Sequence, residues 1–516
     1  MNNTATLVPS DQIIVAYSDG EITAGQISPD LFYANSRLLA MRLYVDKSFA
    51  TAMPGYAENF YTLMQWEMET FVTPFINISF LTRCSATIPK LLHAVIAILV
   101  VNKFVDRQPD VNEVLMDIKA LPLSVNSATS DEYDIAHWAL YQTYLAGELV
   151  YDTFMSKIHQ QPVKPMSVGL LDVDTCIALE QLANVLAVAY FNPVHLKIDM
   201  VRYNESLEKY ESGRSEKQEQ TLLDKFPPAE QVVLRTPSVI IDSGGRIIVW
   251  YLPGAMTGMI MTDMQCATNS IGHLLNDSIT TRKATEWRTH ESNFYPSPDG
   301  KITPSCINIS PAWFQQGREK HGFPKLDPED GFSPQVSAAL KGDVGRNITT
   351  SLQRSSILVS AALRVMHPDL YRAGIKTQVR LGEWVTQYQL EDMCHHLKHW
   401  ASVFNVVSVI CNRRSPPHRD PKCRPEAFDI MTTAGVYHPV IMDFMNLGIK
   451  FLYDSGSMLA SSCRLVRHHM HVEQGSRIVT AWYMRDSIHN FVGTPRTDYA
   501  KYGNVQRSDP VEQKDV

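Results

Sequence analysis

The sequence predicts an α+β protein in which a mainly helical N-terminal region precedes a β-rich core of the sandwich or jelly-roll type. Residues 1–205 contain apolar residues at helical spacing, most clearly in 131–150 and 176–190. Residues 406–491 instead contain short strand-like runs separated by Gly and Pro, namely VVSVI, FDIMTT, HPVIMDF, IKFLYD, RLVRHH and RIVTAWYM. Many short strands with turns between them are typical of sandwiches and jelly rolls.

The composition is that of an ordinary globular protein with two or three folding units, because 45% of the 516 residues are hydrophobic and 20% are charged. The net charge of −7 gives no overall attraction to nucleic acid or anionic membranes, so a nucleic-acid site would have to be a local basic patch. The N-terminus has no basic stretch followed by an apolar core, and the longest apolar run, 91–101, is too short to span a bilayer. We therefore expect neither a secretory signal nor a membrane partner.

The eight cysteines are scattered and form no C-x-x-C pair. This argues against a disulfide framework and a structural zinc site, and for a reducing compartment.

Changes in composition divide the chain into four parts. Residues 1–205 form the helical region, to which no role can be given, and 206–230 are a charged stretch that we interpret as a solvated linker. Residues 231–493 form the β-rich domain, and the polar tail 494–516 is expected to be disordered. Within the domain, the turn residues 242–245 predict a β-hairpin. Helices are expected at 351–365 and 385–403.

The residues that carry chemistry lie between Asn412 and Arg477. His418 and Asp420 form an H-x-D triplet, and on a strand they would point to the same face while Arg419 points away. A second histidine is available further along the chain, at His468, His469 or His471. Two histidines and one carboxylate on one metal form the facial triad of non-heme Fe(II) oxygenases, which leaves positions open for a 2-oxo acid and O2.

A 2-oxoglutarate cosubstrate also needs a cation for its distal carboxylate. Arginine suits this task because its planar fork can bond both oxygens. Arg477 lies nine residues after His468, on the next apolar strand. In a jelly roll, the turn after the distal histidine would bring this strand back beside it.

Residues 231–493 resemble the TET/JBP-like 2-oxoglutarate and Fe(II)-dependent dioxygenases that occur as expanded, transposon-associated sets in mushroom-forming fungi. The resemblance rests on the order of several motifs, which are VIIDSGGRIIVWYLPG, SPAWFQQG, ALRVMHPDLYRAG, VFNVVSVICNRRSPPHRD, FDIMTTAGVY, LGIKFLYDSGSML, CRLVRHHM and GSRIVTAWYMRDSIH. It implies a double-stranded β-helix (jelly-roll, cupin-like) catalytic core with flanking helices. It also implies an oxygenase that uses Fe(II), 2-oxoglutarate and O2.

Carried over to this sequence, the resemblance implies that His418 and Asp420 are the proximal iron ligands and His468 the distal one. It places Arg477 on the C5 carboxylate of 2-oxoglutarate and Asn412 in the cosubstrate or base pocket.

The implied reaction is oxidation of a methylated nucleobase, of the 5-methylcytosine or N6-methyladenine type, in DNA or RNA, with DNA preferred. The base would be flipped out of the helix to reach the iron. Arg414, Cys423 and His489 would contact this substrate. Cys423 replaces an acidic residue that reads the base amino group in some relatives, and His489 occupies a base-contacting position. A basic run beside the triplet would either contact phosphate or form a solvated loop, and consists of Arg413, Arg414, Arg419, Lys422 and Arg424.

Several alternatives remain open. His469 replaces the glycine that follows the distal histidine in the family, so His469 and His471 are alternative ligands, although a strand would direct both away from the face of His468. The substrate could instead be a protein or small molecule, or the chain could be a catalytically decayed transposon-associated binding protein. An intracellular, nuclear location follows only from the proposed substrate class.

Other clusters are better explained by packing. His396 and His399 lie one turn apart in the helix expected at 385–403, and no partner pair for a metal site is visible elsewhere. Three tryptophans are expected in the core rather than at a stacking platform, namely Trp287, Trp313 and Trp400.

Overall fold

The computed structural model describes residues 14–18, 21–26, 138–161, 171, 173–208, 211–276, 278–281, 287–314, 333–437, 440–470, 472 and 474–506. The chain divides into two compact units, one made of residues 1–145 and 164–172 and the other of 146–163 and 173–516. In the first unit, β1 (Ile14–Ser18) and β2 (Glu21–Gln26) form an antiparallel pair in a region where helices were predicted. Most of the predicted helical region before residue 138 lies outside the described residues.

The helices expected at 131–150 and 176–190 correspond to α6 (Trp138–Ile158) and α7 (Val173–Tyr190), although residues 131–137 are not described. The short helix α8 (Met200–Glu205) follows, and the Asp199 side chain caps it by accepting from the amides of Val201 and Arg202. None of the helices described is long and apolar enough to cross a membrane.

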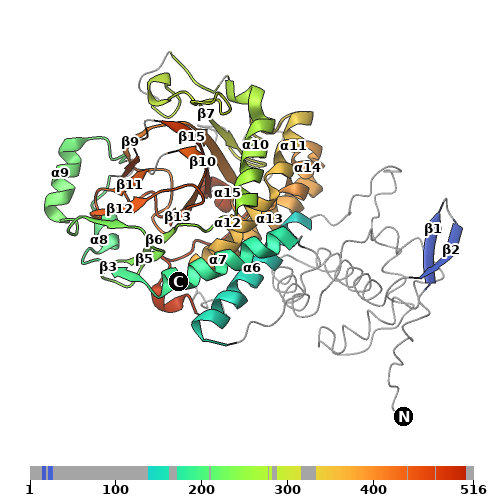
Figure 1. Cartoon of the computed structure of the whole chain (residues 1–516), viewed down its shortest axis with the longest axis horizontal. Helices are drawn as coiled ribbons and strands as arrows, with labels where there is room; N and C mark the ends of the chain where they lie inside the picture. The colour runs from blue at the N-terminus through green and yellow to red at the C-terminus, as the bar shows by residue number, and fades with distance from the viewer. Residues whose placement is uncertain are drawn as a thin grey trace, which may run out of the picture. The chain divides into compact units, whose positions relative to one another are not determined.

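The second unit is built on two β-sheets, visible side by side in Figure 1. The larger sheet has eight strands in the order β3 (Pro193–His195), β5 (Ser238–Ile241), β6 (Ile247–Leu252), β13 (Met458–Ser461), β10 (Asp429–Tyr437), β15 (Gly475–Tyr483), β8 (Val406–Cys411) and β7 (Ser305–Ile309). The smaller sheet has five strands in the order β4 (Val232–Leu234), β12 (Ile449–Leu452), β11 (Ile441–Phe444), β14 (His468–Met470) and β9 (Ser415–His418). The hairpin predicted at 242–245 is confirmed by the pairing of β5 with β6.

The main apolar core lies between the sheets, because residues of both contribute to one cluster. Tyr251 and Leu459 enter it from the larger sheet, and Phe444 and Phe451 from the smaller one. The outer face of the larger sheet is covered by α7, which contacts β5 and β6, and by α10 (Gly258–Asn276), which contacts β10 and β15. All six residues of β6 are buried for this reason. The predicted α+β class with a double-stranded β-helix core is confirmed.

Further helices lie next to α10 (Figure 1). They are α11 (Asp343–Ser351), α12 (Gln353–Met366), α13 (Pro368–Gln387) and α14 (Glu391–His399), and α15 (Asp486–Phe491) follows the last strand. Of these, α11 and α12 contact α10, whereas α13 packs against α12 and α14 against α11. Short 3₁₀ turns occupy Glu291–Asn293, Ala338–Leu340 and Tyr502–Asn504. The single helix predicted over 385–403 is wrong, because the backbone turns at Gln389, whose φ is 52°, and separates α13 from α14.

Two stretches predicted to be solvated are partly packed against the body. The segment 206–230 contains α9 (Glu216–Lys225), in which Glu219 is buried. In the tail, Tyr502 stacks on Tyr190 with ring centroids 4.6 Å apart, and its hydroxyl donates to the Tyr190 carbonyl at 2.6 Å. Composition alone does not reveal these contacts, because each polar segment is held against the domain by only a few buried side chains. A few such residues do not change the average composition of the segment.

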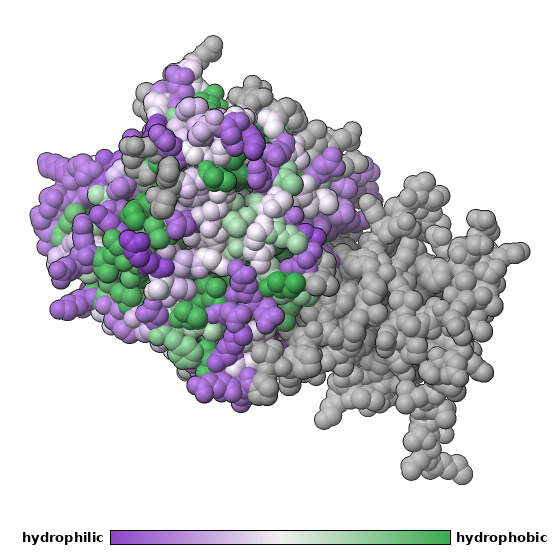
Figure 2. All heavy atoms as spheres, in the orientation of Figure 1, coloured by the Kyte–Doolittle hydropathy of each residue, from purple (hydrophilic) through white to green (hydrophobic). Residues whose placement is uncertain are grey.

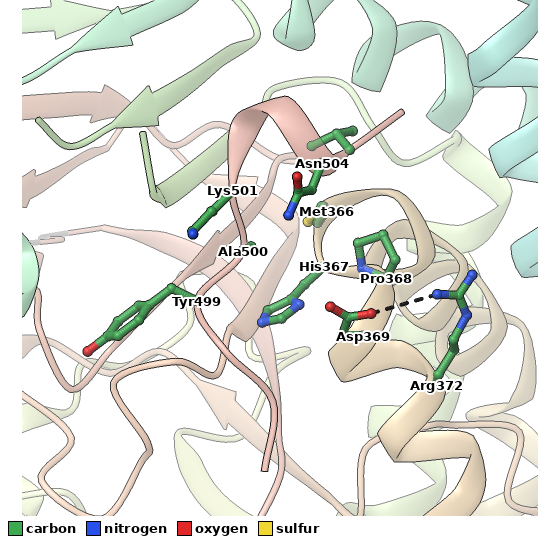
Figure 3. A pocket seen from close by; sticks show the side chains of 10 residues that line it. Met366, His367, Pro368, Asp369, Arg372, Tyr499, Ala500, Lys501 and Asn504 are labelled. Atoms are coloured by element: carbon green, nitrogen blue, oxygen red, sulfur yellow. Dashed lines mark ion pairs between the residues drawn. The ribbon is translucent and has the colours of Figure 1, made fainter. Parts of the chain in front are cut away.

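The junction between α12 and α13 is fixed by His367, which is buried beside a small pocket (Figure 3). Its Nδ1 accepts from the Leu370 amide at 3.3 Å and caps α13, so Nε2 carries the proton and donates to the Glu426 carbonyl at 3.1 Å. The pocket also contains the Asp369–Arg372 pair at 3.7 Å. Its volume of about 20 Å³ is only enough for a water molecule, so this pocket cannot hold a substrate.

This histidine predicts a pH dependence of stability. Burial lowers the pKa of His367 from 6.5 to about 4. The folded protein therefore keeps it neutral while the unfolded chain binds a proton, so stability falls as the pH drops from about 6.5 to about 4. Between pH 7 and pH 5 the loss from this group is about 2 kcal/mol.

Urea unfolding of the wild type and of His367→Asn at both pH values measures this effect. Asparagine retains a capping oxygen but does not titrate, so the variant should lose less stability on acidification. Other buried histidines remain in both proteins and cancel in the comparison. Equal pH slopes for the two proteins would contradict the prediction.

Candidate active site

The antiparallel pairing of β9 with β14 brings two predicted metal ligands together. His418 and His468 are directly opposite each other in the register, and their ring centroids are 4.2 Å apart. Asp420 lies two residues beyond His418, just past the end of β9. The three side chains offer one ligand atom each within 4.8 Å of one another, which gives two nitrogens and one oxygen around a single point.

The protonation states of these three groups suit a divalent cation. The Nδ1 atom of His418 lies 2.8 Å from the Pro416 carbonyl, and that of His468 lies 3.2 Å from the Val466 carbonyl. Because a carbonyl only accepts, each Nδ1 carries the proton and each Nε2 keeps its lone pair. Burial lowers the pKa of both histidines, so they are neutral at pH 7.

Asp420 supplies the negative charge. Burial by itself would raise its pKa, but the neighbouring His418 and Arg288 lower it to about 2. The Arg288 guanidinium donates to the Asp420 carboxylate at 2.5 Å. The carboxylate is therefore ionised and lies against a positive charge.

His469 points away from this cluster. It faces Asp443 on β11, with Nε2 3.7 Å from a carboxylate oxygen, as the alternation of side chains along β14 requires. His471, the third histidine considered from sequence, lies outside the described residues. Among the described residues, His468 is the distal histidine that joins His418 and Asp420.

Arg477 on β15 is a buried cation. Its side chain is 2% exposed, and its Nε and one terminal nitrogen have no hydrogen-bond partner. The guanidinium lies over the rings of Tyr437 and Tyr453, at 5.7 and 5.3 Å from their centroids. No carboxylate of the described residues pairs with it. A buried guanidinium without an anion is costly, so this arrangement indicates an anionic ligand.

Asn412 positions this arginine through the backbone. Its side-chain oxygen accepts from the Arg477 amide at 2.8 Å, and its own amide donates to the Arg477 carbonyl at 3.0 Å. Asn412 directly follows β8 and has a φ of 49°, a left-handed conformation that asparagine tolerates. Asn412 therefore contacts the backbone of Arg477 but does not line the cavity that contains the Arg477 side chain.

A cavity of about 540 Å³ contains the three candidate ligands and Arg477. Its lining includes three methionines, of which Met431 comes from the larger sheet and Met442 and Met470 from the smaller one. Trp287, assigned to the core from sequence, also lines the cavity, and its ring packs edge-on against His418 at 4.5 Å. This volume is typical of sites that enclose small molecules.

Residues 335–486 match the Tet_JBP family, described as the oxygenase domain of the 2OGFeDO superfamily. This match gives the chain the activity class of a 2-oxoglutarate-dependent dioxygenase. The matched residues include His418, Asp420, His468 and Arg477, which the structure brings to one cavity.

Comparison with solved structures gives a match to NgTET1 in complex with 5mC DNA. The sequence identity is 12% and the TM-score 0.32, and the match covers 54% of this chain and 87% of that chain. Among curated proteins, none matches the sequence.

The residues present fit the groups that the Tet_JBP domain implies. His418, Asp420 and His468 would hold Fe(II), and they offer the donor set of the facial triad in the correct protonation states. Arg477 would hold the distal carboxylate of 2-oxoglutarate, which would supply its missing partner. When bound together with O2, these groups supply a hydroxylation that is coupled to the conversion of 2-oxoglutarate to succinate.

The residues predicted to bind substrate are dispersed. Cys423 lines the cavity, and its thiol donates to Asp429 at 3.0 Å. Arg414 does not line it, because its guanidinium donates to the Val472 and Phe294 carbonyls. His489 is buried in α15, where burial lowers its pKa to about 3, and it does not line the cavity either.

Most side chains of the basic run form hydrogen bonds or ion pairs within the protein. Arg413 is buried and donates to the Arg288 carbonyl, Arg419 pairs with Glu219, and Arg424 pairs with Asp486. Lys422 is exposed and lines the cavity. Within the run, a phosphate contact is therefore left mainly to Lys422.

Sequence reasoning missed a polar group at one end of the cavity. Tyr483, Ser408 and Asn308 lie within hydrogen-bond distance of one another, and Arg485 lies over the Tyr483 ring at 4.7 Å. Asp429 joins them in the lining, and burial together with the charge of Asp420 raises its pKa to about 7. Strand alternation would have revealed part of this group, because every second residue of β15 from Arg477 to Tyr483 lines the cavity.

Proposed function

We propose that this dioxygenase oxidises the methyl group of a methylated nucleobase in nucleic acid, with DNA as the first candidate. The observation that carries the proposal is the single cavity in which the metal triad and Arg477 are followed by a polar lining formed by Asn308, Ser408 and Asp429. A flat base could pack against the methionines of the lining while these donors and acceptors bond its edge.

The rim of the cavity supports a polyanionic substrate. Lys422 is exposed and lines it, so it is available to a phosphate group beside a flipped nucleotide, whereas Arg288, also exposed and part of the lining, is held by its ion pair with Asp420. Trp287 lies between the rim and His418, and Arg288 stacks on its ring at 4.6 Å. The protein residues thus position the substrate and limit the access of water to the metal. A nuclear location and a relationship to fungal, transposon-associated members would agree with this proposal.

Succinate production with defined oligonucleotides tests the proposal. Matched DNA and RNA oligonucleotides with 5-methylcytosine, N6-methyladenine or the unmodified base are compared, and the modified base is followed by mass spectrometry. We expect one methylated oligonucleotide to stimulate succinate formation and to yield the oxidised base. Lys422→Glu should weaken this stimulation and increase its salt sensitivity, because it reverses a charge at the rim.

A second candidate is the same chemistry on a protein or small molecule. It is favoured by the net charge of −7 and by the internal ion pairs of Arg419 and Arg424, which are not available to a polyanion. If no nucleic acid alters succinate formation at low salt while a peptide or small molecule does, the second candidate replaces the first.

A further inference from the structure

The residue between the two proximal ligands is anchored from outside the matched domain. Arg419 points away from His418 and Asp420 and is completely buried. Its terminal nitrogens donate to both carboxylate oxygens of Glu219, one of them at 2.8 Å, and to the Tyr203 hydroxyl. Glu219 belongs to α9, more than 100 residues before the start of the Tet_JBP match at residue 335.

The same carboxylate also lies close to the residue that precedes the distal ligand. Arg467, next to His468, has its Nε 3.9 Å from a Glu219 oxygen and donates from that atom to the Gly213 carbonyl at 2.7 Å. A terminal nitrogen of the same guanidinium donates to the Glu216 carboxylate. Glu219 therefore lies between two buried guanidinium groups, that of Arg419 just after β9 and that of Arg467 just before β14.

The backbone before α9 adds a second anchor. The Arg419 amide donates to the Ser212 carbonyl at 2.7 Å. Gly213 has a φ of 71°, and a Cβ atom there would lie 3.0 Å from a terminal nitrogen of Arg419. The chain thus passes directly over Arg419, and a side chain at residue 213 would disturb the contact.

The position of α9 in the molecule fits this role. It lies at the edge of the domain beside the smaller sheet (Figure 1), and its outer face is hydrophilic (Figure 2). Only Glu219 and Leu222 of the helix are buried. A buried carboxylate in an otherwise polar helix is retained at a cost in solvation, and here it compensates two positive charges.

We infer that Glu219 is a positioning residue that sets the distance between the His418–Asp420 pair and His468 by holding Arg419 and Arg467 together. A facial triad tolerates displacements of only about 0.5 Å, so the spacing of β9 and β14 matters for metal binding. Loss of the Glu219 charge leaves two like charges buried near each other, and the strands that carry the ligands shift apart. The inference rests on the metal triad but not on the identity of the substrate.

Co(II) titration of the purified full chain, followed by its visible absorption spectrum, tests this role without substrate or turnover. We expect Glu219→Gln to weaken Co(II) binding by at least about 10-fold and to change the ligand-field spectrum at saturating metal. Glu216→Gln is the matched control, because this side chain is 76% exposed and pairs with Arg467 but, among the described ion pairs, not with Arg419. Its Co(II) affinity should change by less than about 5-fold, and its spectrum should stay that of the wild type.

The outcomes separate a positioning role from a merely structural one. A Glu219→Gln protein that is less stable but binds Co(II) with wild-type affinity and spectrum overturns the inference. If Glu219→Gln does not fold, Glu219→Asp takes its place, since it keeps the charge and shortens the arm by one methylene. His418→Ala tests the triad itself: unchanged Co(II) binding in that variant would contradict the metal site and this inference with it, whatever the nucleic-acid assays show.

Discussion

Replacing Arg477 with methionine is expected to raise the KM for 2-oxoglutarate by about 100-fold or more, while the apo protein unfolds at the same temperature or a higher one. The first effect follows from the loss of a charged fork that can bond both oxygens of a carboxylate. The second follows from the environment of Arg477, which is buried with two unpartnered nitrogens. Removing a buried charge that has no anion relieves its desolvation cost.

Succinate formation at varied 2-oxoglutarate concentrations and thermal unfolding without ligands measure the two effects. Arg477→Lys is the matched variant, because it keeps a point charge but loses the fork, so its KM should lie between those of the wild type and Arg477→Met. Since Tyr437 and Tyr453 lie close to the guanidinium, part of the gain in stability is offset by lost cation–π contacts. A wild-type KM in Arg477→Met would show that another group binds the cosubstrate.

The convergence of the three candidate metal ligands could be predicted from sequence because it depends largely on the alternation of side chains along a strand. His418 and Asp420 are two residues apart, and the register that places His468 opposite His418 follows from the antiparallel pairing of two short strands. The same alternation explains why His469 faces Asp443 instead of the metal site. Side-chain direction along a strand is a strong constraint that needs no knowledge of distant contacts.

The substrate end of the cavity could not be predicted in the same way. His489 follows β15 in a motif that suggests a base contact, but the chain turns into α15 and buries the side chain outside the cavity lining. Asn308 and Ser408 meet only because β7 pairs with β8, a contact over 100 residues of sequence. The donors and acceptors at this end come from several separate strands and from no continuous motif.

The fold shows the same division between local and distant information. The strands β8, β10 and β15 could be predicted from their apolar composition, whereas α9 could not be assigned a role from its polar sequence. The composition of α9 does not indicate that Glu219 is buried, because most residues around it in the helix are polar and exposed. Its partner Arg419 was correctly predicted to point away from the metal, but nothing in the sequence indicated what it would meet there.

His468→Ala is expected to abolish metal binding and turnover, whereas His469→Ala should leave both close to the wild type. The two residues are adjacent on β14, but His468 contributes a neutral imidazole to the cluster with His418 and Asp420, and His469 lies on the opposite face. Loss of a residue that only hydrogen-bonds to a metal ligand typically weakens metal binding by about 10- to 100-fold. Loss of one of the three ligands themselves should therefore weaken it by more than about 100-fold. Co(II) or Fe(II) titration and succinate formation measure the difference.

This pair of variants decides between the histidines that the sequence left open. Both substitutions remove an imidazole from the same strand, so general damage to β14 would affect the two proteins alike. His418→Ala should behave as His468→Ala does, because the lone pairs of both rings point to the same cluster once their Nδ1 protons are held by the Pro416 and Val466 carbonyls. Metal binding that survives in His468→Ala but fails in His469→Ala would place the metal on the other face of β14, beside Asp443, and the assignment of the whole cavity would have to be abandoned.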